Sequence, residues 1–516
     1  MSIISTDHAF VRKHQDKISG VLSCFDRVIL RGHLPLSYSR GVEGFLYQQG
    51  VPLKEFKNYA PQLAERIKAH VKGRVLAAGA PYRHLPTKEP MEEQARRLAQ
   101  EQGIRAGIVC GFSQLEVCGT FRLEWSDQLR RLHLRKDFRK CTVLYVFLMH
   151  AVLGLIHVKI QTWLPLTMQV YVNGHDFVAK KLDALGVKYA LHDNAFLWVA
   201  DLKAAQRCAD RFVKLNWPKL LGQLARQFNP LLGRELPWQE YYWAMNQAEH
   251  ATDVLFNNAS ALAGLYPRLV EHARACFTAQ DVLKFLGRKV NANFKGEVYT
   301  HVHRRVEGVR IKHQMKSNKL KMYDKAGRVL RIETTINNPS EFRVWRPRAN
   351  RRGLAWQSLP KGVAWLWRYA EVSRSANGRY LEALLSVDDD SAARRLLDRA
   401  TRPAELHGRR KRALQPLSPA DQQLFLAVMR GEHRLRGLRN HDLTRWLYPS
   451  RTADRLERRR RCGRVTRLIQ LLRAHRLVAK IPRTRRYRIT AAGERLMGAA
   501  IKIKELGLPH HIHTAA

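Results

Sequence analysis

Hydrophobic and polar residues alternate in short runs from residue 141 onward. Ile156, Val158 and Ile160 alternate with polar neighbours, and a period of two is typical of a strand that buries one face. One helix is predicted after each pair of strands, over 177–185 and over 202–212. This ββαββα order is typical of an α+β fold, in which helices cover an antiparallel sheet.

The apolar run from Cys141 to Val158 is nearly long enough to span a bilayer. Gly154 interrupts the run, His150 lies inside it, and strand-like alternation follows. We therefore expect a buried β-hairpin here and no membrane partner.

Changes in pattern and composition divide the chain into five regions. A strand pair is predicted over 21–34 and a long helix over 238–256, while proline and charged residues crowd 386–419 as in a linker. The predicted regions are an N-terminal α/β region (1–140), a β-meander with packed helices (141–235), a helical segment with a β-hairpin core (236–386), a basic linker (387–416) and a C-terminal domain (417–508).

The C-terminal domain returns to a helical period. Helices are predicted over 421–429, 440–448 and 455–474, then strands over 477–481 and 487–490, and then a closing helix. The third helix has an apolar stripe on one face and arginines on the other. The stripe is Val465, Leu468, Ile469, Leu471 and Leu472, and the basic face is Arg459, Arg460, Arg464, Arg467 and Arg473. The loop between the strands adds Arg483, Arg485 and Arg486.

This succession of three helices, two strands and a closing helix resembles the winged-helix domain, including that of bacterial regulators of the MarR kind. The resemblance covers about ninety residues. It implies that the third helix enters the major groove of DNA and that the loop between the strands contacts phosphate or the minor groove. The arginines of the third helix and of the loop between the strands are then the nucleic-acid-binding residues. Shape-only RNA binding and protein contact are the alternatives, and dense arginine on one helix face argues against protein contact alone.

The charge of the chain favours the same kind of partner. Its 516 residues include 91 Lys and Arg against 44 Asp and Glu, a formal net charge of +47. Roughly 28 of the basic and 8 of the acidic residues follow residue 400. Clustered positive charge binds polyphosphate by releasing counterions, so we expect a nucleic acid partner, DNA before RNA. Ribosome association and unspecific adhesion to anionic surfaces are the other interpretations.

With 45% hydrophobic residues, the chain can form folded cores.

Seven cysteines are scattered along the chain without a Cys-x-x-Cys pair. Neither a disulfide framework nor a zinc ribbon is predicted, and a reducing cytoplasm is the simplest location. The sequence has no P-loop, no dinucleotide-binding glycine motif and no serine nucleophile elbow. An ATP-driven motor and a dehydrogenase are therefore not expected.

Two short strands joined by Lys325-Ala326-Gly327 carry the candidate chemistry. A three-residue loop that ends in glycine is a common hairpin connection, and the apolar pattern selects this register. One face is then Leu320, Met322, Leu330 and Ile332, and the other is Lys321, Tyr323, Arg331, Glu333 and Thr335. Glu333 is a candidate ligand of a divalent metal, Mg²⁺ or Mn²⁺, and Lys321 and Arg331 are candidates to hold a phosphate. An ordinary surface hairpin with paired charges would show the same pattern.

The Tyr-acidic-Lys strand followed by an Arg-x-Glu strand resembles plasmid rolling-circle replication initiators and related phage nicking proteins, over about twenty residues. The resemblance implies that Tyr323 forms a 5′-phosphotyrosine link and that Glu333 binds metal. His301-Val302-His303 matches the His-hydrophobic-His metal motif of these families, and strand alternation puts both imidazoles on one face. A second copy at 511–513 is taken as a chance match.

Two hypotheses follow for the function. The first is a DNA-binding protein that nicks and joins strands, as in replication initiation or the transfer of a mobile element, with Tyr323 as nucleophile and a metal held by Glu333, His301 and His303. The second is a non-enzymatic binder, either a winged-helix regulator or the partner of a structured RNA. The oligomeric state and the target sequence do not follow from the pattern.

Overall fold

The computed structural model describes residues 8–33, 35–87, 89–128, 130–236, 242–288, 296–305, 308–348, 353–387, 399–430, 432–433, 437–450 and 452–505. The fold is α+β and multidomain, as expected. The chain divides into two compact units. The first is Met1–Thr6, Asp16–Ala259 and Lys325–Asn377, and the second is Asp7–Gln15, Ser260–Asp324 and Gly378–Ala516.

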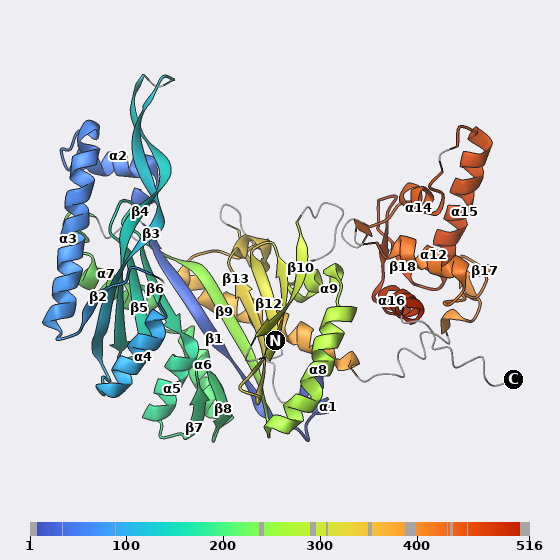
Figure 1. Ribbon diagram of the computed structural model, residues 1–516, viewed down its shortest axis with the longest axis horizontal. Coiled ribbons are helices and arrows are strands. Elements are labelled where there is room, and N and C mark those ends of the chain that lie inside the picture. Colours follow the sequence, from blue (N-terminus) through green and yellow to red (C-terminus); the bar gives the residue numbers. More distant parts are fainter. Residues whose placement is uncertain are drawn as a thin grey trace. The chain divides into compact units, whose positions relative to one another are not determined.

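An antiparallel sheet forms the centre of the first unit (Figure 1). Its strands are adjacent in the order β13, β9, β1, β6, β5, β4, β3 and β2, and only β2 and β3 run parallel. Their bounds are β1 (Ile18–His33), β2 (Tyr82–His84), β3 (Gly107–Ser126), β4 (Arg131–His150), β5 (Gly154–Gln161), β6 (Met168–Asn173), β9 (Tyr242–Phe256) and β13 (Val329–Ile336).

Helices and two small strand pairs complete the first unit. The helices are α2 (Ser39–Gln48), α3 (Phe56–Ala77), α4 (Met91–Glu101), α5 (Gly174–Ala184), α6 (Leu202–Phe212), α7 (Trp217–Phe228) and the first part of α10 (Leu366–Ala383). The pairs are β7 (Tyr189–His192) with β8 (Ala195–Val199), and β14 (Arg343–Pro347) with β15 (Leu354–Ser358). Short 3-10 helices cover Pro35–Ser37, Leu53–Glu55, Pro339–Glu341 and Val363–Trp365.

The second unit combines helices with a three-stranded antiparallel segment. Its elements are α1 (Ala9–Lys13), α8 (Ala259–Cys276), α9 (Ala279–Phe285), β10 (Val298–Arg305), β11 (Gly308–Met315), β12 (Asn318–Lys325), the 3-10 helix Leu384–Ser386, β16 (Ala404–Leu406), β17 (Arg409–Lys411), α12 (Pro419–Val428), α14 (Asn440–Leu447), α15 (Arg455–Ala474), β18 (Val478–Lys480), β19 (Tyr487–Ile489) and α16 (Ala491–Glu505). The paired strands β16 and β17 lie where the sequence indicated a linker.

The predicted strand pair over 21–34 is a single strand, β1. Two residues of β1 lie opposite one residue of β9, because Phe25 pairs with His250 and Val28 pairs with Ala248. This is the geometry of a β-bulge, which bends a strand without ending it. The bulge, and not a turn, therefore accounts for the polar interruption at Asp26 and Arg27.

The helix predicted over 238–256 was wrong, because residues 242–256 form strand β9; residues 238–241 lie outside the described residues. β9 is buried on both faces from Ala248 to Phe256. A strand buried on both faces loses the period of two that marks an exposed strand. Its internal polar residues, among them Glu249 and Asp253, then mimic the spacing of a helix face.

Both strands of the predicted hairpin form, as β12 and β13. The connection folds as expected for a glycine-ended loop, since Ala326 and Gly327 have φ angles of +52° and +71° and the Arg328 amide donates to the Lys325 carbonyl at 3.2 Å. On β12, Leu320 and Met322 are buried, in agreement with the predicted apolar face. β13 differs from the prediction, because all eight of its residues are buried.

The C-terminal elements follow in the predicted order. Helices α12, α14 and α15 precede the paired strands β18 and β19, and α16 closes the domain. The apolar stripe of α15 enters its core, where Val465, Ile469 and Leu472 are buried with residues of α12 and α16. The arginines of the opposite face of α15 stay accessible.

The apolar run over 141–158 is a hairpin, as predicted, with β4 and β5 paired from Val143 to His150. In the described part of the chain, no helix is both long and apolar enough to cross a membrane. Beyond Gln114, β3 and β4 pair only with each other and extend past their neighbours as a two-stranded arm (cyan in Figure 1).

His157 on β5 is expected to make the protein sensitive to acid. Its half-buried ring stacks on Tyr171 at 4.6 Å between centroids, and burial, followed by the charges of Lys159 and Arg27, lowers its pKa to about 3. The unfolded chain takes up a proton near pH 6.5 and the native state does not, so stability falls as the pH falls from about 6.5 to about 3. The free energy of unfolding of the native protein should therefore fall between pH 6.5 and pH 4.5. In His157→Phe this fall should be smaller by about 2–3 kcal/mol, since a shifted group contributes about 1.4 kcal/mol per pH unit.

Urea unfolding at the two pH values measures this difference. The exposed His192, changed to Phe, is the matched control and should keep the native pH dependence. An unchanged slope in His157→Phe would contradict the prediction.

Candidate functional site

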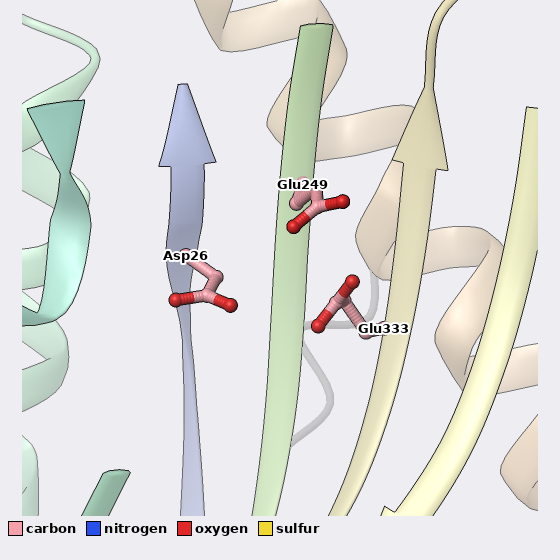
Figure 2. Close-up of side chains that lie close together, drawn as sticks. All are labelled: Asp26, Glu249 and Glu333. Atoms are coloured by element: carbon pink, nitrogen blue, oxygen red, sulfur yellow. The ribbon is translucent and has the colours of Figure 1, made fainter. Parts of the chain in front are cut away.

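Three carboxylates gather on one face of the sheet in the first unit (Figure 2). Asp26, Glu249 and Glu333 each offer an oxygen, and these oxygens lie within 4.8 Å of one another. The side chains of Asp26 and Glu249 are each 8% exposed, and Glu333 is 1% exposed. We call this group the carboxylate cluster. Among the described residues it is the only group of three or more potential ligands that is close enough to hold a metal.

The cluster comes from three adjacent strands. Glu249 of β9 pairs directly with Thr335 of β13, and Glu333 lies two residues along the same face. On β1, the bulge places Asp26 and Arg27 opposite Glu249. Antiparallel pairing brings diagonal neighbours within reach of long side chains. Strand register therefore fixes the positions of the three carboxylates.

A buried ionic layer lies beside the cluster. Arg331 is fully buried, and it donates to both oxygens of Asp253, from Nε to Oδ1 and from Nη2 to Oδ2, each at 2.7 Å. Its Nη1 lies 3.6 Å from Asp26 Oδ2. His175, at the start of α5, lies between the same two acids, with Nδ1 3.5 Å from Asp26 and Nε2 3.3 Å from Asp253.

These contacts set the charge of the layer. Burial by itself raises the pKa of Asp26, but the hydrogen bond with His175 and the charge of Arg331 outweigh it and hold this pKa well below its usual range. The pKa of Asp253 is likewise lowered, against burial, by Arg331 and His175. Burial would lower the pKa of His175, yet its bonds to Asp253 and Asp26 help to raise it well above the ordinary value.

Neutral donors orient the carboxylates. Asn194 and Asn173 donate to Asp26 at 2.6 and 3.4 Å. Gln247 donates to Glu249 at 2.9 Å, and Thr335 lies within 3.3 Å of the same carboxylate.

A glycine allows the close approach of α5 to β1. A Cβ atom on Gly174 would stand 2.2 Å from the carbonyl oxygen of Phe25, the residue before Asp26. No real side chain fits at that distance. Gly174 therefore lets α5 begin, with His175, directly beside the bulge.

The donor set fits a hard divalent cation. Carboxylate oxygens are the ligands that Mg²⁺ and Mn²⁺ prefer. The buried His175 Nδ1 is directed at Asp26 across 3.5 Å.

The sequence-based site residues divide between the two units. Glu333 lies in the carboxylate cluster, and Arg331, predicted to hold phosphate, is bonded to Asp253 beneath it. Sequence reasoning missed Asp26 and Glu249 as its partners. Asp26 could have been identified as an acidic residue inside an apolar strand. Glu249 was not recognised as a partner of Glu333, because its segment was predicted to be a helix.

The other predicted residues share a face of the β10–β12 segment in the second unit. His301 pairs with Lys312, which pairs with Lys321, and His303 pairs with Arg310, which pairs with Tyr323. The His301 and His303 rings are 5.8 Å apart, so they do lie on one face. We call these six residues the basic face.

Its charges repel one another. Burial and then the charges of Lys312 and Arg310 lower the pKa of His303, and burial with Lys319, Arg310 and Lys321 lowers that of Lys312. Such a surface favours an anion. The predicted grouping of His301 and His303 with Glu333 around a metal stays a prediction.

The predicted arginines of the C-terminal domain lie on one face of α15 and in the loop between β18 and β19. Arg459, Arg460, Arg464, Arg467, Arg483 and Arg485 are exposed, and Arg473 and Arg486 are half-buried. Arg473 lies over the ring of Tyr487, with its Cζ atom 5.9 Å from the ring centroid. The domain thus presents a cationic helix face and a cationic loop.

Comparison of the chain with protein-family models, with curated proteins and with solved structures gives no match.

Proposed function

We propose that the protein is a divalent-metal-dependent enzyme that cuts nucleic acid strands, DNA being the favoured substrate. The observation that carries the proposal is the carboxylate cluster, because three converging carboxylates are a donor set for Mg²⁺ or Mn²⁺. A metal held there would stabilise the charge that develops on a phosphodiester under attack and lower the pKa of a bound water. Asp26, Glu249 and Glu333 are its proposed ligands.

Charge supports nucleic acid as the substrate. The chain carries a formal net charge of +47, and its cations include the basic face and the arginines of α15. Phosphate contacts of this kind supply most of the affinity of unspecific binding and position a duplex. The order of helices and strands in the C-terminal domain fits a winged helix that finds the target site.

The nucleophile is proposed to be Tyr323. It lies on the basic face, directly opposite Arg310. A neighbouring cation favours the phenolate, the form that attacks phosphorus. In this scheme the tyrosine oxygen bonds to phosphorus, the bond to the leaving sugar oxygen breaks, and that oxygen takes a proton. The phosphotyrosine link conserves the energy needed to rejoin strands.

A cleavage assay with the full chain tests the proposal. Labelled single- and double-stranded DNA and RNA are incubated with the protein and Mn²⁺, Mg²⁺ or EDTA. We expect cleavage of DNA with either metal and none with EDTA, together with a covalent protein–DNA adduct on denaturing gels. Tyr323→Phe should bind DNA normally and form no adduct.

The outcomes separate the parts of the proposal. Cleavage by Tyr323→Phe at the native rate would exclude the tyrosine and leave a metal-bound water as nucleophile. Tight binding without cleavage of any substrate would exclude the enzymatic activity and leave a non-enzymatic binder. Cleavage of RNA alone would show that the substrate is RNA and not DNA.

A further inference from the structure

A concave pocket of about 660 Å³ lies in the C-terminal domain. It is formed by described residues between α12 and α14, by α14 itself and by the residue that precedes β19. Six of its lining residues carry the argument: Arg430, Arg439, His441, Arg445, Trp446 and Arg486. A volume of this size is typical of small-ligand sites.

The acidic residues of the pocket are already engaged. Glu432 accepts from Arg430 Nε at 3.1 Å, and Asp442 accepts from the Arg439 amide at 2.8 Å. In the described part of the chain, the side chains of Arg439 and Arg445 form no ion pair, and both are exposed in the pocket. Their guanidinium groups are therefore available to a ligand.

The lining also holds a stacked platform. The guanidinium of Arg430 lies 3.5 Å from the centroid of the Trp446 ring, and Trp446 remains 47% exposed. An arginine stacked on an aromatic ring keeps its in-plane N–H groups clear of that ring, and one of them, the Nε–H of Arg430, already donates to Glu432. Exposed aromatic rings beside cations also stack on nucleic acid bases.

We infer that this pocket binds the terminal phosphate of a nucleic acid strand, with the terminal base near Trp446. Four arginines against Glu432 and Asp442 leave a charge of +2 (4 − 2). A phosphomonoester carries about −1.5 to −2 at neutral pH, whereas an internal phosphodiester carries one charge. Charge and concavity thus both favour a strand end over the middle of a strand. The inference rests on the proposed nucleic acid function and adds recognition of an end to it.

Binding of short single strands of one sequence to the full chain tests the inference. Three fluorescent strands carry a 5′-phosphate, a 3′-phosphate or two free hydroxyls, and EDTA prevents cleavage. We expect one phosphorylated strand to bind at least about tenfold more tightly than the hydroxyl strand, as charge-assisted hydrogen bonds require. The preferred strand identifies which end the pocket takes.

Variants assign the preference to the pocket. Arg439→Gln with Arg445→Gln should bring the three affinities within about twofold of one another. Arg402→Gln with Arg409→Gln removes the same charge from exposed positions of the same unit and should keep the preference. Circular dichroism checks that both double variants are folded. A preference that survives Arg439→Gln with Arg445→Gln would overturn the inference.

A nucleoside 5′-monophosphate distinguishes the two levels of the proposal. Equal binding of all three strands, without competition by the nucleotide, would exclude terminal-phosphate binding by the pocket and leave the proposed nucleic acid binding intact. No binding of any strand, with thermal stabilisation by the nucleotide that the pocket variant loses, would overturn the proposed function and keep the pocket.

Discussion

Glu333→Gln is expected to reduce metal-dependent strand cleavage by roughly 10² to 10³-fold. The substitution keeps the shape of the side chain and removes one of the three charges that would hold the cation. Glu333 is 1% exposed, so no water replaces the lost ligand freely. Initial cleavage rates over a range of Mn²⁺ concentrations measure the effect.

Thermal unfolding gives a second readout of the same substitution. Mn²⁺ should raise the Tm of the native protein, because a cation that binds only the folded state stabilises it, and it should not raise the Tm of Glu333→Gln. Glu65→Gln, at a surface position that is 72% exposed, is the control and should behave as the native protein. Native cleavage together with a native Mn²⁺ response in Glu333→Gln would exclude the carboxylate cluster as a metal centre.

Arg331→Met should destabilise the first unit by about 3–5 kcal/mol. Methionine fills a similar volume but leaves Asp253 charged, buried and without its principal partner. His175 remains 3.3 Å from Asp253, but the cost of a buried charge that has lost both bonds to Arg331 exceeds the small gain from the apolar side chain. Urea unfolding at neutral pH measures the difference in the free energy of unfolding.

Two further variants assign this effect to the buried charge. Arg331→Met combined with Asp253→Leu removes both charges and should recover part of the loss, because apolar replacements of a buried ion pair are often nearly neutral. Arg207→Met breaks a surface ion pair of 3.8 Å and should change stability by less than about 1 kcal/mol. A loss below about 1 kcal/mol in Arg331→Met would show that Asp253 does not depend on Arg331.

The parts of the fold that local pattern determines could be predicted from the sequence. The bounds of α6 and α15 match the predicted 202–212 and 455–474, because each helix has one apolar and one polar face. The apolar face of β12 was also correct. β9 could not be predicted in this way, because α10 packs on the face of β9 opposite the carboxylate cluster, where Asn377 donates to the His250 carbonyl and to Thr252. A strand covered on both faces has no alternation to detect.

The candidate site was only partly within reach of sequence reasoning. Glu333 stood out because its neighbours alternate around it. Asp26 and Glu249 meet it through strand pairing between distant segments, and local spacing does not encode such pairing. The hairpin motif supplied one residue of the cluster, and the order of strands in the sheet supplied the other two.

The long separation of the cluster residues has a consequence for synthesis. Asp26 and Glu333 are 307 positions apart (333 − 26), and a ribosome adding about 5–20 residues per second needs about 15–60 s to make that stretch. Until β13 leaves the ribosome, the nascent chain has at most two of the three carboxylates. A product that ends before β13 therefore lacks one of the three proposed metal ligands, and it also lacks the arginines of the C-terminal domain, which follow β13 in the chain.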